Sequence, residues 1–316
     1  MKSSQGALPA SAYVLLGSLA LFWGVNWTAL KVVLAEMGPW HFRAWCLGGG
    51  AAGLFVIAAL GGHSLRIPRG SWCAITVISL FNMVAWNVFV AFGVPLMDSG
   101  RAVVVAYTFP AWGVLFGAWI AREPLTGRAL LGMALGLGAV ALLLGRELEA
   151  VGRSPAGTLL LLGAAIGWAI GTALMKRWPM AMPVSSYTAW QLAIGFVPIF
   201  LVALVRDPGG FSPVALSRPA LAAFIYTVVI CFMYCYWAWM KVATVVPVSV
   251  SSIGVLLVPI VGVFSGMILL GERPHWSDYA ALALVVAALA TLMLPAAAAR
   301  AVAAREGLPP AGAVER

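Results

Sequence analysis

The chain has 316 residues, of which 63% are hydrophobic and only 9% are charged, compared with roughly 25% charged residues in an average soluble domain. A water-soluble fold of this size has too little interior to bury so much apolar surface, so the composition excludes a soluble globular protein. The net charge of +9 does not indicate nucleic-acid binding either, because the Lys and Arg residues are scattered singly or in pairs and form no basic stripe.

Apolar runs of about the length that crosses a bilayer follow one another along the chain. A hydrocarbon core about 30 Å thick requires a helix of about 20 apolar residues. Ten such runs are found, at residues 12–34, 40–60, 71–92, 99–121, 128–145, 155–175, 185–205, 219–240, 248–270 and 275–294. The connections are short, so the sequence predicts an all-α membrane protein of ten transmembrane helices, with a disordered or frayed cytoplasmic tail over 296–316.

One stretch with a proline, two glycines and a glutamate occurs twice, with an offset of 149 residues. The first copy has Pro110, Gly113, Gly117 and Glu123, and the second has Pro259, Gly262, Gly266 and Glu272. Each proline lies in the middle of a predicted span, where it removes one backbone hydrogen bond and allows the helix to bend. Each glycine pair allows a neighbouring helix to approach closely. We therefore predict a hinge and packing unit in both copies.

The duplication extends to most of the chain. Trp23 and Lys31 recur as Trp168 and Lys176 with an offset of 145 residues, and spans one, two and four have counterparts in spans six, seven and nine. The sequence therefore predicts two homologous five-span repeats, at 1–148 and 149–295. Because five is an odd number, the second repeat enters the membrane from the opposite side, as in many alternating-access transporters. The Lys and Arg distribution favours both termini in the cytoplasm.

Ionisable groups are missing from the middle of the predicted spans. All ten Asp and Glu residues and all three His residues lie at span ends, in connections or in the tail. This distribution favours facilitated diffusion or exchange over carboxylate-coupled pumping, and it provides no catalytic set for an enzyme. The four Cys residues lack His or carboxylate neighbours, so no metal site or other cofactor is predicted. Lys31 is interpreted as a lysine that extends toward the membrane surface, although a role for Lys31, or for Asn, Ser and carbonyl groups, in ion coupling stays open.

The polar side chains within the spans are mainly amides, hydroxyls and indoles. An amide such as Asn26 or Asn82 that faced lipid would cost several kcal/mol, so it is expected to face another helix or a wet cavity. Helical spacing places Asn26 on one stripe with Trp27, and Asn82 on one stripe with Trp86. Ring faces and neutral hydrogen-bonding groups suit a small solute with an apolar or aromatic body and polar ends. Packing between helices is the alternative for any single one of these residues.

The residues Trp23-Gly24-x-Asn26 with Lys31, the two mid-span prolines and the glutamates that follow spans four and nine resemble the EamA-type repeats of the drug/metabolite transporter superfamily. The run Asp98-Ser99-Gly100-Arg101-Ala102 is similar to YddG-type exporters. The resemblance implies a bacterial inner-membrane protein with a central cavity and aromatic amino acids as substrates. Together with Trp86, which is taken from helical spacing, the candidate substrate-binding residues are Asn26, Asn82, Trp86, Tyr107, Trp168, Trp237 and Ser251.

These observations predict an exporter of aromatic or other largely apolar amino acids and related metabolites. Its partners would be a small-molecule substrate and the lipid bilayer, and the sequence does not indicate an oligomeric state. One alternative is a carrier of nucleobases, drugs or sugar metabolites. An alternative of a different class is a non-transporting membrane receptor or assembly partner.

Overall fold

The computed structural model describes residues 10–122, 125–149, 155–206, 213–238 and 248–293, and over these residues it contains helices and no β-strand. In chain order the helices are α1 (Ala10–Leu34), α2 (Pro39–Leu60), α3 (Trp72–Ser79), η1 (Leu80–Ala85), α4 (Trp86–Gly93), η2 (Val94–Leu96), α5 (Ser99–Ala106), α6 (Phe109–Ile120), α7 (Gly127–Glu149), α8 (Ala156–Arg177), α9 (Val184–Arg206), η3 (Pro213–Ala215), α10 (Arg218–Ile225), η4 (Tyr226–Cys235), α12 (Val248–Leu270) and α13 (Trp276–Met293). Helix occupies each of the ten predicted apolar runs. The predicted tail over 296–316 lies outside the described residues.

The helices have the composition of membrane spans. Seven described helical segments are long and apolar enough to cross a bilayer, and three shorter apolar helices, within α7, α12 and α13, occupy the remaining runs. Large apolar side chains point outward, including Leu60, Trp119 and Ile268, which are 85%, 76% and 78% exposed. An apolar outer surface with its backbone hydrogen bonds closed inside helices is what the hydrocarbon interior requires. The predicted all-α membrane fold is confirmed.

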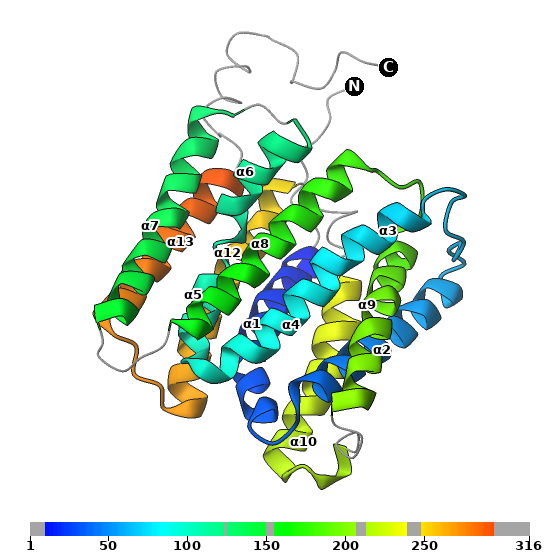
Figure 1. Cartoon of the computed structure of the whole chain (residues 1–316), viewed down its shortest axis with the longest axis horizontal. Coiled ribbons are helices and arrows are strands. Elements are labelled where there is room, and N and C mark those ends of the chain that lie inside the picture. The colour runs from blue at the N-terminus through cyan, green and yellow to red at the C-terminus, as the bar shows by residue number, and fades with distance from the viewer. Residues whose placement is uncertain (1–9, 123–124, 150–154, 207–212, 239–247, 294–316) are drawn as a thin grey trace.

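The packing of the helices relates the two halves of the chain. α2 packs along α9 at one edge of the bundle and α7 packs along α13 at the other, while α1 lies against α12, and α8 lies against α6 (Figure 1). In the repeat, α1 corresponds to α8, α2 to α9, α7 to α13, and the fourth span (α5 and α6) to α12. The contact of α1 with α12 therefore corresponds to the contact of α8 with the fourth span, and the α2–α9 and α7–α13 contacts each correspond to themselves. Such a pattern indicates a pseudo-two-fold relation. With five spans in each half, it corresponds to inverted repeats.

The third and eighth spans contain segments of π-helix at equivalent places. η1 follows α3 directly and runs into Trp86 of α4, whereas η4 follows α10 and ends at Cys235. A π-helical turn has one more residue than an α-helical turn, so it changes which side chains face the neighbouring helices, and such turns are frequent at functional sites. Each half therefore has π-helical backbone in its third span, and this span packs on the first span of the other half: η1 on α8, and η4 on α1.

The fourth span is divided into two helices. α5 ends at Ala106, and α6 begins at Phe109 with Pro110 in its first turn, where the missing backbone N–H requires no helical partner. Within the break, the hydroxyl of Thr108 donates a hydrogen bond of 2.7 Å to the carbonyl of Val105. The fourth span is therefore interrupted just before Pro110, and the predicted hinge role of Pro110 stays a prediction.

The ninth span differs, because α12 continues through Pro259 as one helix. Its backbone is described from Val248 onward, but the side chains of residues 248–256, including that of Ser251, lie outside the described part of the chain. Glu123, the glutamate of the first copy, also lies outside it.

The glycines of the second copy lie in a close contact between α12 and α5. A Cβ atom added to Gly262 would lie 2.6 Å from Cγ1 of Val103, and one added to Gly266 would collide with the carboxylate of Glu272 and lie 2.8 Å from Oγ of Ser99. Only glycine permits this separation of the two helices.

The glycines of the first copy are placed differently. Gly117 is buried in α6, whereas a Cβ atom on Gly113 would meet no atom of another described element within 4 Å. The expected packing of a neighbouring helix on Gly113 is therefore not observed among the described residues. Instead α7 approaches α6 through its own Gly136, whose added Cβ would lie 2.5 Å from Cβ of Ala111.

Candidate functional site

Five aromatic rings form a closed cluster where α1, α4, the α5–α6 break and α8 meet. The neighbouring ring centroids are separated by 6.5 Å for Trp27 and Trp86, 5.1 Å for Trp86 and Trp168, 6.4 Å for Trp168 and Phe109, 5.7 Å for Phe109 and Tyr107, and 6.5 Å for Tyr107 and Trp27. Most of these pairs are edge to face, the arrangement that the ring quadrupoles favour. We call Trp27, Trp86, Tyr107, Phe109 and Trp168 the five-ring cluster.

The five-ring cluster brings together three of the residues that the sequence predicts to bind substrate, namely Trp86, Tyr107 and Trp168. Phe109 is a member that sequence reasoning missed, because a phenylalanine beside a proline in an apolar run carries no distinguishing signal. Trp27 is 5% exposed, but the other four rings keep part of their surface accessible. The rings are therefore not completely covered by one another and by the helices.

The two predicted amides bridge helices. Asn26 accepts a hydrogen bond of 3.1 Å through Oδ1 from the hydroxyl of Thr227, which joins α1 to η4. Asn82 is 2% exposed; its Nδ2 lies 3.2 Å from Sδ of Met175, and its Oδ1 lies against Gly171 on α8 without a hydrogen-bond partner. Both amides therefore face protein rather than lipid, and Asn82 keeps one acceptor unused.

Trp237 lies outside the five-ring cluster. Its ring centroid is 5.9 Å from that of Tyr234, and both side chains pack on the buried group formed by Leu16, Leu19 and Cys235. The structure thus places Trp237 in a contact between α1 and the helical turn that follows η4. Ser251, the last predicted substrate-binding residue, has its side chain outside the described residues.

Arg43 is a buried charge that the sequence interpretation counted among the basic residues of the connections. It lies in the second turn of α2 and is 3% exposed, and its guanidinium carbon is 5.2 Å from the ring centroid of Phe42. Its Nε and Nη2 atoms are buried without a hydrogen-bond partner. An arginine four residues inside an apolar run is the sequence signal that could have identified it.

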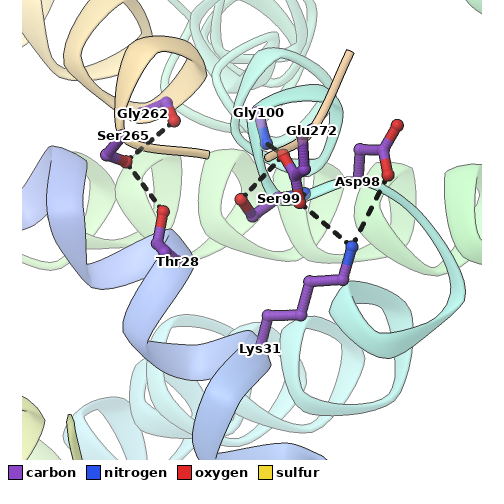
Figure 2. Close-up of polar contacts among 8 residues, drawn as sticks. All are labelled: Thr28, Lys31, Asp98, Ser99, Gly100, Gly262, Ser265 and Glu272. Carbon is purple, nitrogen blue, oxygen red and sulfur yellow. Dashed lines mark hydrogen bonds and ion pairs between the residues drawn. The ribbon is translucent and has the colours of Figure 1, made fainter. Parts of the chain in front are cut away.

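A polar network joins three elements at the end of α1 (Figure 2). Nζ of Lys31 lies 3.0 Å from Oε1 of Glu272 and 3.6 Å from Oδ1 of Asp98. The carboxylate of Glu272 also accepts hydrogen bonds from the backbone N–H of Ser99 at 2.7 Å, from its hydroxyl at 3.0 Å, and from the N–H of Gly100 at 3.1 Å. We call this group the Glu272 network. It connects the last turn of α1, the first turn of α5 and the end of α12.

The Glu272 network adds to the interpretation of Lys31 as a lysine at a span end, because its ammonium is held there by two carboxylates. Burial raises the pKa of Glu272, but the hydrogen bonds from Ser99 and Gly100 and the nearby ammonium of Lys31 together outweigh burial, so the pKa lies below its ordinary value of 4.5. The positive N-terminal end of α5 contributes to the same preference for an ionised carboxylate. A hydrogen bond of 2.8 Å between the hydroxyls of Thr28 and Ser265 extends the α1–α12 contact (Figure 2).

A separate apolar groove of about 720 Å³ is lined by Trp40, Phe92 and four residues near the end of α9. None of the predicted substrate-binding residues lines this groove. Among the residues that the structure describes, no group of three or more His, Cys, Asp or Glu side chains is placed to hold a metal ion.

Ten apolar spans in two related halves, with aromatic side chains from both halves gathered between them, define a multi-pass membrane transport protein. The EamA-like transporter family model matches residues 10–145 and 155–294. The chain therefore belongs to the EamA-like transporter family, with two copies of its repeat, and is a transporter rather than an enzyme.

Several known proteins are similar to this chain over most of its length. An uncharacterized transporter, YoaV, of Bacillus subtilis (strain 168) is 24% identical over 263 residues, which cover 82% of this chain and 89% of the relative. A protein of Escherichia coli (strain K12) named "Probable amino-acid metabolite efflux pump" is 27% identical over 275 residues, which cover 81% and 87%. A solved crystal structure matches with a TM-score of 0.63 and 21% identity over 89% of this chain and 95% of that chain, which shows the fold.

Proposed function

We propose that the protein exports aromatic or other largely apolar amino acids and related metabolites by alternating access. In this proposal it lies in a bacterial inner membrane with both termini in the cytoplasm. The five-ring cluster is the observation that carries the substrate assignment, and the relatives named as amino-acid metabolite efflux pumps support it.

The five-ring cluster has the chemistry to hold an apolar or aromatic side chain. Four of its rings keep accessible surface, so a flat or branched apolar group has ring faces and edges to contact. Asn26 lies one residue before Trp27 on α1 and is partly exposed, so its amide offers a neutral polar group to one end of a solute. Asn82 lies four residues before Trp86 in the third span and is buried against α8.

The backbone around the five-ring cluster supports a role in conformational change. Tyr107 and Phe109 flank Thr108 in the α5–α6 break, so a rotation of α6 relative to α5 moves both rings. Trp86 directly follows the π-helical segment η1. Because Trp168 belongs to the second half and the other four rings to the first half, relative motion of the halves opens or closes the cluster.

In this proposal the Glu272 network closes one end of the transport pathway, on the side of the five-ring cluster where α1 ends. It holds α1, α5 and α12 together through charge-assisted hydrogen bonds, and the opening of that end requires these bonds to separate. In the sequence, Lys176 and Glu123 correspond to Lys31 and Glu272, but Glu123 lies outside the described residues.

Transport in proteoliposomes tests the proposal. Labelled phenylalanine, tryptophan and threonine and an unrelated cationic drug are offered to the purified full-length protein, and we expect flux of the two aromatic amino acids to be the fastest. Trp168→Ala should reduce that flux at least tenfold, whereas the matched change Trp119→Ala, at an outward-facing ring of α6, should leave it unchanged. Faster flux of the drug would favour a drug carrier, and binding without flux would identify a receptor.

A further inference from the structure

The guanidinium of Arg43 is the buried charge that the proposed mechanism leaves without a role. Two partly buried cations of the described chain have partners: Lys31 is held in the Glu272 network, and Arg101 donates to the carbonyl of Leu143 and lies 3.9 Å from Asp278. Arg43 is more buried than either, yet no carboxylate among the described residues is paired with it.

The described neighbours of Arg43 are an aromatic ring and two weakly acidic side chains, and none of them is a carboxylate. One face of its guanidinium lies over the ring of Phe42, and Cys46 on the next turn of α2 and Tyr236 on the eighth span are the ionisable groups near it. Nε and Nη2 point along one edge of the guanidinium, and both lack an acceptor. Two adjacent N–H groups in a plane are the pattern that binds the two oxygens of a carboxylate.

Tyr236 connects Arg43 to the five-ring cluster. The ring of Tyr236 lies 6.0 Å from that of Trp23, which is one helical turn before Trp27 on α1. Tyr236 therefore links the surroundings of Arg43 to α1, the helix that carries Trp27 of the five-ring cluster.

We propose that Arg43 binds the carboxylate of the transported solute while the five-ring cluster holds its apolar or aromatic body. This inference rests on the proposed transport function and narrows its substrate class to carboxylates with an apolar side chain. An arginine without an acidic partner inside a membrane protein is costly to maintain, and an anionic ligand that supplies the missing acceptors accounts for its retention. The ammonium group of an amino acid is then secondary to recognition.

Three probes that share one ring separate the two polar groups of a substrate. L-phenylalanine has both groups, 3-phenylpropanoate has only the carboxylate, and 2-phenylethylamine has only the ammonium. We expect calorimetry on the purified full-length wild type to show that both carboxylates bind at least tenfold more tightly than 2-phenylethylamine. This series requires no substitution, so it decides the question even where a variant does not fold.

Substitutions then test the residue itself. Arg43→Gln should weaken phenylalanine binding at least tenfold and leave 2-phenylethylamine binding unchanged, whereas Arg43→Lys should keep part of the preference for carboxylates. The matched control is Arg128→Gln on α7, where an exposed arginine donates to the carbonyl of Thr291 far along the chain. The control should bind all three probes as the wild type does.

The outcomes distinguish this inference from the proposed function. Equal binding of phenylalanine to wild type and Arg43→Gln, equal binding of the amine and the carboxylates, or no binding of either carboxylate would each overturn the Arg43 site. Carboxylate-selective binding that depends on Arg43, without any flux in proteoliposomes, would support the site and overturn the transport proposal. Flux of phenylalanine in both wild type and Arg43→Gln at equal rate and KM would support transport and overturn the site.

Discussion

The two copies of the proline-glycine-glutamate stretch have the same sequence pattern but different backbones. The first is interrupted between α5 and α6, with Pro110 in a new first turn, whereas the second passes through Pro259 as the single helix α12. The residues that precede the prolines differ as well: Thr108 corresponds to Leu257. The hydroxyl of Thr108 bonds the carbonyl of Val105 and so offers the backbone an alternative to the helical hydrogen bond, which Leu257 lacks.

The copies also differ in what their glycines contact. The second copy packs Gly262 and Gly266 on the first turns of α5, and its glutamate completes the contact through Ser99. Gly113 of the first copy has no such neighbour among the described residues. The proline-glycine-glutamate pattern is therefore compatible with both a continuous and an interrupted helix, and the neighbouring residues determine which of the two forms. The continuous copy provides rigid packing, and the interrupted copy positions the aromatic rings.

The largest expected effect on stability comes from Glu272→Gln. The substitution removes the charge that holds Lys31 and weakens the bonds from Ser99 and Gly100, at an expected cost of about 2 kcal/mol, since hydrogen bonds to charged groups contribute roughly 1.5–3 kcal/mol. The midpoint of thermal unfolding in detergent should fall by about 5 °C. The matched control is Glu36→Gln, because Glu36 accepts the same two kinds of bond from Ser217 but is exposed. A fall in the control as large as that in Glu272→Gln would contradict a special role for the Glu272 network.

The pH dependence of stability reports on the same carboxylate. Because the pKa of Glu272 is lower in the folded protein than its ordinary value of 4.5, its contribution is complete above about pH 4.5 and is lost as the pH falls through the folded-state pKa. The wild type should therefore lose more stability than Glu272→Gln between about pH 5 and pH 3, measured as the unfolding midpoint at each pH. Parallel curves would show that Glu272 is not linked to folding.

A smaller effect on stability should separate the glycines of the two copies. Gly262→Ala places a methyl group against a side-chain methyl of Val103, and we expect this overpacking to cost about 1 kcal/mol, the lower end of the usual range. Gly113→Ala meets open space and removes the conformational freedom of a helical glycine, so stability should stay unchanged or rise by roughly 0.5–1 kcal/mol. Both values follow from unfolding midpoints of the two variants. A loss at Gly113 equal to that at Gly262 would mean that a helix packs there after all.

The smallest expected effect concerns rate rather than stability. Pro110→Ala restores a backbone N–H that can reach the carbonyl of Ala106, so α5 and α6 become able to join into one helix. Flux of the transported solute should then fall about fivefold, which corresponds to a transport barrier higher by about 1 kcal/mol. Pro259→Ala acts on a helix that is already continuous and should change flux by less than about twofold. Proteoliposome flux measures both variants, with ligand binding as the control. Equal effects at the two prolines would remove the functional distinction between the copies.

The sequence by itself determined the number of spans, the duplication and the family. Each span must satisfy its own backbone hydrogen bonds in lipid and must be apolar over its whole length, so local composition is sufficient to locate it. The repeat was visible because proline, glycine and glutamate recur at a fixed offset, and the odd number of spans in each half then required inversion.

Tertiary structure alone decided which residues face one another. The sequence placed Lys31 and Glu272 at span ends, but their pairing depends on α1 and α12 ending at the same place, 241 residues apart in the chain. The position of Arg43 inside an apolar run marked it as unusual, but only packing showed that α2 buries it without a carboxylate partner among the described residues. The five-ring cluster depends in the same way on the relative rotation of four spans, which hydropathy does not encode, because lipid-facing and inward-facing surfaces are both apolar.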